Sequence, residues 1–259
     1  MTTAHKVYMG SCNVCGDVIL ATSMSVGLEI RPAFYDHIFG LRDTDSAPGK
    51  GPSGGGTKQR TLYRYYPGVA KLNVSGLVLQ NGLGGLWEDA KKGSDCSGDC
   101  DFGEESHGVS GVVSSLTISC QAGEPANISV EIQGKEISKR KHARTNFLAR
   151  ASCDPPMLWS DFDVGGAPGN EVIAFTITVN NAVKPVYLST GDGFWPEEMR
   201  CGTQDISGSV TTIGGDDWAR EGSISFPGGG MDVIYGGSKY SGDVGGIYVA
   251  TTPFTGYYT

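Results

Sequence analysis

The sequence lacks the long apolar stretch that a membrane-spanning helix requires. Nowhere in its 259 residues is there a run approaching the roughly 18 apolar side chains of a bilayer span. The first residues, MTTAHKVYMGSCN, also lack a basic segment followed by an apolar one. We therefore expect no signal peptide and no membrane span, and an intracellular product.

Positive charge is scarce as well. Lys and Arg total 20 residues against 28 Asp and Glu, which gives a formal net charge of −8. Proteins that hold duplex DNA by electrostatics rely on basic patches. The charge balance therefore excludes a nucleic-acid binder of that kind.

Residues that favour helices are few, whereas residues that favour strands are many. The chain has 13 Leu but 34 Val and Ile, and 18 Thr. β-Branched side chains pack well on a pleated sheet, so the composition predicts a mainly β fold. Short apolar runs with period-2 alternation give the clearest candidate strands, which are Ala70–Gln80, Val112–Ser119, Ala126–Gln133, Ile173–Asn180 and Asp205–Ile213.

Three segments carry helix signals, and two read as loops. Leu83–Lys92 places apolar residues at helical spacing, with acids before lysines. Asp216–Glu221 opens with two acids, and Pro32–Leu41 is a third short candidate helix. The Gly/Ser-rich stretches Asp43–Lys58 and Asp95–Gly108 are expected to be long exposed loops.

Residue patterns that carry catalysis are missing. Ser53 lies in a Gly-rich loop without flanking strands, so nothing would fix its hydroxyl against a base. The histidines show no metal-ligand or base spacing; they are His5, His37, His107 and His142. We therefore expect no enzyme activity, and no catalytic, cofactor-binding or metal-binding residues.

The cysteines leave one alternative open. There are seven, an odd number that does not indicate a disulfide framework in a chain without a signal peptide. Cys12 and Cys15 have the spacing of a zinc knuckle, and Cys96 and Cys100 could complete a four-cysteine site. The sequence does not decide whether these four bind metal, form disulfides or stay reduced.

An internal repeat divides the chain. Gly76 precedes Trp87 by 11 residues, and Gly208 precedes Trp218 by 10, each within a strand–helix–strand–strand pattern. The repeat predicts two related modules in tandem. Residues 1–68 hold N-terminal strands and the Gly/Pro-rich loop of the first module, 69–150 complete it, and 151–259 form the second.

Charge is also distributed unevenly. Glu88–Glu105 holds seven acids and two lysines, whereas Lys135–Arg150 holds six Lys/Arg and one acid. In a monomer both are solvated faces. In a chain that stacks head-to-tail, one could face the other across a heterologous interface.

Several motifs resemble those of a known family. Ile173–Tyr187, Trp195–Gly202 and Asp205–Thr211 resemble the strand, Asn-Asn turn, Pro-Glu segment and Ser-Gly-Ser strand of the tail tube proteins of tailed bacteriophages. Ser223–Tyr235 and Gly246–Thr251 resemble the closing strands of the tube domain. Two further ranges, Val74–Gly93 and Ser114–Gly134, match the family more loosely.

The resemblance implies a fold and a function. The fold is one of β-sandwich or barrel modules, and their sheets join between subunits into rings that stack into a DNA-conducting tube. With two modules per chain, three chains would make a pseudo-sixfold ring, whereas one module per chain would require six. The protein would belong to the virion tail, be assembled in the host cytoplasm, and contact tape measure, tail tip and terminator proteins. The alternatives are a tail-tip or tail-completion ring protein, and a four-cysteine zinc-binding module.

Overall fold

The structure is a computed structural model and is mainly β. It describes residues 10–29, 32–35, 62–65, 68–80, 83–102, 105–141, 154–166, 172–187, 195–214, 220–242 and 248–257. The predicted loop Asp43–Lys58 and most of the predicted helix Asp216–Glu221 lie outside these residues. In this part of the chain, none of the helices reaches the length and hydrophobicity that a membrane span requires.

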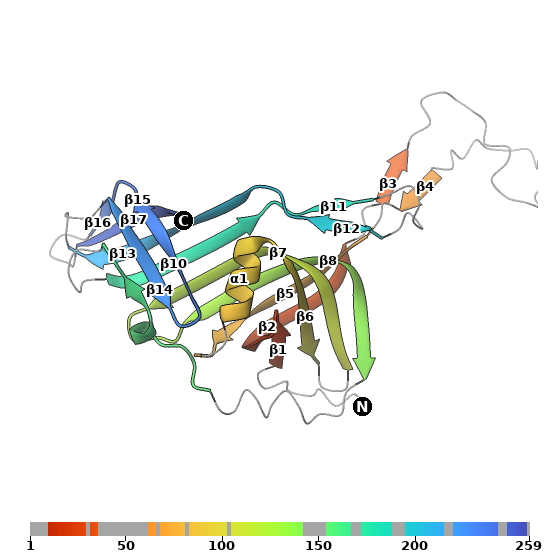
Figure 1. The fold of residues 1–259 in the computed structure, drawn as a ribbon, viewed down its shortest axis with the longest axis horizontal. Helices are drawn as coiled ribbons and strands as arrows, with labels where there is room; N and C mark the ends of the chain where they lie inside the picture. Colours follow the sequence, from red (N-terminus) through yellow and green to blue (C-terminus); the bar gives the residue numbers. More distant parts are fainter. Residues whose placement is uncertain are drawn as a thin grey trace, which may run out of the picture.

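Each half of the chain supplies its own set of elements (Figure 1). Those of the first half are β1 (Gly10–Val14), β2 (Asp17–Glu29), β3 (Pro32–Tyr35), β4 (Leu62–Tyr65), β5 (Val69–Val78), α1 (Gly84–Lys92), β6 (Asp95–Asp101), β7 (Glu105–Gln121) and β8 (Asn127–Lys141). Those of the second half are the 3-10 turn η1 (Trp159–Asp161), β9 (Asp163–Val164), β10 (Val172–Asn181), β11 (Lys184–Val186), β12 (Glu198–Arg200), β13 (Gln204–Ile213), β14 (Glu221–Phe226), β15 (Gly229–Tyr235), β16 (Lys239–Ser241) and β17 (Val249–Tyr257).

One antiparallel sheet runs through both halves, in the order β6-β1-β2-β5-β8-β7-β10-β13-β17-β15-β14-β9, with β16 beside β17. The long strand β7 connects the halves because it changes partner along its length. Its residues 106–112 pair with β6, and its residues 115–121 pair with β10. Because β6 pairs with both β1 and β7, six strands of the first half close into a barrel.

The two halves share one strand order. The series β2-β5-β8-β7-β6 in the first half corresponds to β10-β13-β17-β15-β14 in the second, with the strands following one another along the chain in the same sequence. In each half a short hairpin, β3–β4 or β11–β12, follows the first strand of the series. Gly76 in β5 and Gly208 in β13 also occupy equivalent places, since Gly76 pairs with Ile128 of β8 and Gly208 with Phe254 of β17.

Close strand contacts explain both glycines. A Cβ at Gly76 would overlap the backbone of Leu20 and Ala21, and one at Gly208 would overlap the Thr176 carbonyl and the Phe254 ring. Trp218, the partner of Trp87 in the sequence repeat, lies outside the described residues.

Gly76→Ala and Gly208→Ala are each expected to lower the free energy of unfolding by about 1–3 kcal/mol, because the added methyl group must displace neighbouring backbone. Gly27→Ala in β2 is the matched control, since a Cβ there meets nothing within 4 Å. It should change stability by no more than about 0.5 kcal/mol. Chemical denaturation followed by tryptophan fluorescence measures all three variants; equal stability of Gly76→Ala and Gly27→Ala would contradict the close-approach explanation.

The helix prediction for Leu83–Lys92 is confirmed by α1. The side chains of Leu83, Leu86, Trp87 and Ala90, predicted to share one face, are all fully buried. The first residues of the predicted helix Pro32–Leu41 instead form strand β3, paired with β4; residues 36–41 lie outside the described part.

The prediction of an exposed loop over Asp95–Gly108 is wrong. Residues 95–101 form β6, and β7 begins at Glu105. Within β6, Cys96, Gly98 and Cys100 are buried and alternate with more exposed residues, and a Cβ on Gly98 would overlap Leu72. Cysteine behaves as a small hydrophobe when it is buried, so the segment has the alternation of a strand. Its Gly, Ser and Asp content nevertheless resembles that of a loop, which explains the wrong prediction.

Candidate functional site

A row of small hydroxyl side chains crosses the sheet on the face opposite the core. Residues paired in register lie on the same face of a sheet. The row, which we call the hydroxyl band, runs through β2, β5, β8, β7, β10, β13 and β17 and consists of Ser23, Ser75, Ser129, Thr117, Thr178, Ser207 and Thr255.

Hydroxyl groups of the band bond to one another across the strands. The Ser75 and Ser129 hydroxyl oxygens are 3.1 Å apart, and those of Thr117 and Thr178 are 3.5 Å apart. The Thr117–Thr178 pair spans the junction between β7 and β10, so the band passes from one half to the other without interruption. The band therefore forms a smooth, uncharged polar strip across both halves.

A neighbouring row of this face is polar and contains acidic residues. This row consists of Asn73, Glu131, Ser115, Asn180 and Asp205. The Lys71 ammonium beside it lies 2.7 Å from Glu29 and 3.7 Å from Glu131. These two carboxylates raise the pKa of Lys71, chiefly through the bond to Glu29. The positive charge of Lys71 is therefore paired with Glu29 and Glu131, next to the hydroxyl band.

Helix α1 packs against strands of both halves (Figure 1). It belongs to the first half by sequence, and its first turn is held there. The Leu86 N–H donates to Asp17 Oδ2 at 2.7 Å, in place of the side-chain cap that Leu83 does not provide. Burial raises the pKa of Asp17, although hydrogen bonds from the backbone of Leu86 and Gly85 act in the opposite direction.

The last turn of α1 is held by side chains of the second half. Buried Asn181 donates from Nδ2 to the carbonyls of Ala90 and Val113, each at 2.8 Å. Gln204 Nε2 lies 2.8 Å from the carbonyls of Ala90 and Lys91. Carbonyls at a helix end have no partner within the helix, so these amides satisfy them. The sequence interpretation of an Asn-Asn turn missed this role, because Asn181 is the last residue of β10 and points into the core.

Trp87 connects the middle of α1 to the second half. Its indole N–H donates to the Gly230 carbonyl at 3.3 Å, and its ring meets Phe226 edge-on with ring centroids 5.1 Å apart. The hydrophobic core is accordingly continuous across both halves. Helix α1 therefore packs against both halves of the sheet that carries the hydroxyl band.

Asn181→Ala is expected to lower the free energy of unfolding by about 1–3 kcal/mol, because the Val113 carbonyl loses its amide donor inside the core. Asn180→Ala is the matched control, since that side chain is exposed on the polar face. It should change the free energy by about 0.5 kcal/mol at most. Denaturant titration compares the two; equal losses would contradict the assigned role of Asn181.

The four cysteines of the predicted zinc site form two disulfides. Cys12 bonds to Cys100 and Cys15 to Cys96, with Cα atoms 4.4 and 5.0 Å apart. All four lie along the junction of β1 and β6, which has three paired positions. The structure therefore does not gather the four sulfurs around one ion, because the register places Cys12 beside Cys100 and away from Cys96.

The charged blocks pair partly within the chain. Glu88 contacts Lys92 at 3.0 Å inside α1, and Glu105 of the acidic block contacts Lys139 of the basic block at 2.6 Å between β7 and β8. The rest of the basic block, from residue 142 to 150, lies outside the described residues.

The continuous antiparallel sheet and its hydroxyl-lined face define a mainly β protein. Comparison with protein families then identifies it more closely. The model of the phage tail tube protein family matches residues 17–256, and the chain belongs to that family. The match covers nearly the whole chain and confirms the resemblance seen in the sequence, so the protein is a structural component of the phage virion tail. No curated protein shows significant similarity to the chain.

Proposed function

We propose that the chain assembles into stacked rings whose joined sheets form the tube that conducts phage DNA, with the hydroxyl band facing the bore. The observation that carries this proposal is the band itself, which crosses seven strands without a charged side chain. Affinity for DNA comes mainly from cations that neutralise phosphates. A hydroxyl-lined wall with acids along one side would let DNA slide, whereas basic walls would hold it.

The junction between the halves supports a ring built from joined sheets. β7 and β10 pair from Ser115 to Gln121, edge to edge within one chain. A second copy could extend the same sheet, which would also cover strand edges that otherwise invite aggregation. In this proposal residues 1–68 and 69–150 form one tube module and 151–259 the second. The repeated strand order favours three chains in a pseudo-sixfold ring over six chains.

The remaining parts of the proposal concern place and partners. Rings form in the host cytoplasm, and the finished tube meets the tape measure, tail tip and terminator proteins. In this proposal the chain forms the wall of the tube and catalyses no reaction. The acidic segment of α1 and β6 contributes to contacts between stacked rings.

Electron microscopy of the purified protein at rising concentration tests the proposal. Hollow tubes or stacked rings, with three chains per ring in averaged end views, are the expected result. Rings that never stack would assign the chain to the tail tip or tail completion, and persistent monomers at high concentration would contradict self-assembly. Six chains per ring would overturn the proposal of two modules per chain but not the proposal of a tube.

A further inference from the structure

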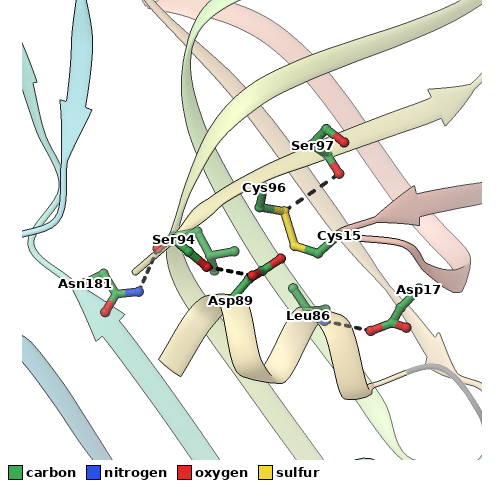
Figure 2. Close-up of a disulfide and its surroundings, with 9 residues drawn as sticks. Cys15, Asp17, Leu86, Asp89, Ser94, Cys96, Ser97 and Asn181 are labelled. Atoms are coloured by element: carbon green, nitrogen blue, oxygen red, sulfur yellow. Dashed lines mark hydrogen bonds between the residues drawn. A yellow bond between two sulfur atoms is a disulfide. The ribbon is translucent and has the colours of Figure 1, made fainter. Parts of the chain in front are cut away.

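A carboxylate lies against one of the two disulfides. Asp89 comes from α1, Cys15 from the turn between β1 and β2, and Cys96 from β6 (Figure 2). One carboxylate oxygen and the two sulfurs all lie within 4.8 Å of one another. Cys96 is only 5% exposed, and the other two residues are half-buried.

The disulfide itself offers this carboxylate no hydrogen bond. Disulfide sulfurs carry no hydrogen to donate, so a half-buried carboxylate gains nothing by facing them. Asp89 Oδ1 accepts instead from the Ser94 hydroxyl at 2.6 Å, which holds the group in place. A half-buried carboxylate beside two sulfurs makes a site that a cation would stabilise.

We propose that in the reduced chain Cys15, Cys96 and Asp89 bind one thiophilic divalent metal ion such as Zn²⁺. Two thiolates and a carboxylate are ligands that zinc commonly accepts, with a fourth position left for water. The Ser94 hydroxyl is the outer hydrogen bond that orients the carboxylate ligand. This inference does not depend on the tube function.

The chemistry balances with a thiol as reductant. Two thiol molecules reduce the Cys15–Cys96 disulfide to two cysteine thiols and become one disulfide themselves. The metal ion then displaces a proton from each cysteine, and both protons leave to solvent. The ion joins the same three elements that the disulfide and α1 packing hold together, so the cross-link between β1 and β6 persists in a reducing compartment.

Metal titration of the whole chain tests the site. The protein is reduced, freed of metal and titrated with Zn²⁺ against a chromophoric chelator, and with Cd²⁺ as an ultraviolet probe of thiolate ligation. We expect the reduced wild type to hold an ion that Cys96→Ser abolishes and that Asp89→Asn binds about 10–100-fold more weakly. Zn²⁺ should raise the unfolding temperature of the reduced chain and leave that of the oxidised chain unchanged.

Two control variants make the result specific. Asp95→Asn removes an exposed carboxylate next to Cys96 and should leave the metal affinity unchanged. Cys12→Ser removes a cysteine of the other disulfide and should leave the ion in place. The proposal is overturned if the reduced wild type retains no ion, if Asp89→Asn binds as tightly as wild type, or if Cys12→Ser abolishes binding as Cys96→Ser does. If Cys96→Ser fails to fold, the metal affinity of Asp89→Asn still tests the proposal.

Discussion

Trp87→Ala is expected to lower the free energy of unfolding by about 3–5 kcal/mol, the range for truncating a large buried aromatic. The side chain is fully buried, packs on Phe226 and donates to the Gly230 carbonyl. Truncation leaves a cavity where α1 meets the second half, and the Gly230 carbonyl loses its hydrogen-bond donor. Because domains of this size have a net stability of about 5–15 kcal/mol, the loss is a large part of the total.

The consequence for assembly follows from the position of Trp87. Without the indole, α1 loses its hydrogen bond to the Gly230 carbonyl of β15 and its ring contact with Phe226, so we expect the two halves to be held together less firmly. Denaturant titration gives the stability, and electron microscopy gives the fraction of protein in tubes; both should fall together. Trp87→Phe keeps most of the buried ring and should lose less. A Trp87→Ala protein with wild-type stability and normal tubes would show that α1 does not set the joint.

Thr178→Arg is expected to leave stability and tube formation nearly unchanged and to make the tube retain DNA. Thr178 lies in the middle of the hydroxyl band, beside the joint between the halves. Each ring would then carry several guanidinium groups in the bore, and stacked rings would contact many phosphates at once. Such multivalent phosphate binding weakens by roughly 10³-fold or more between about 50 and 200 mM salt.

DNA co-sedimentation with purified tubes at both salt concentrations measures this effect. Phage carrying Thr178→Arg should assemble tails of normal length and lose infectivity, because the DNA stalls during ejection. Thr178→Gln, similar in length but neutral, is the control and should behave like wild type. If tubes of the Thr178→Arg variant neither bind DNA nor block its ejection, the hydroxyl band does not face the bore.

The sequence predicted the mainly β class and α1 because both rest on local patterns. Alternating apolar residues mark β5, β8 and β10, and helical spacing marks Leu83 to Ala90. β6 escaped prediction because its inward residues are cysteines and glycine, which by composition resemble a loop. The disulfide partners also escaped, since β1 and β6 meet only when the barrel closes.

The hydroxyl band could not be found in the sequence for a related reason. Each strand contributes one serine or threonine to it, and a single polar residue in an alternating strand marks only the solvent face. The register between seven strands, together with the partner change of β7, brings these hydroxyls into one row. The Gly76/Gly208 repeat is visible in the sequence, but only the strand order shows that the two glycines occupy equivalent strands, β5 and β13.

A side-chain-resolution image reconstruction of the assembled tube tests the central claim most directly. The account predicts the Ser75–Ser129 and Thr117–Thr178 pairs on the wall of the bore, facing the tube axis, in every chain. A reconstruction in which these hydroxyls lie on the outer surface of the tube, or are buried between rings, would contradict it.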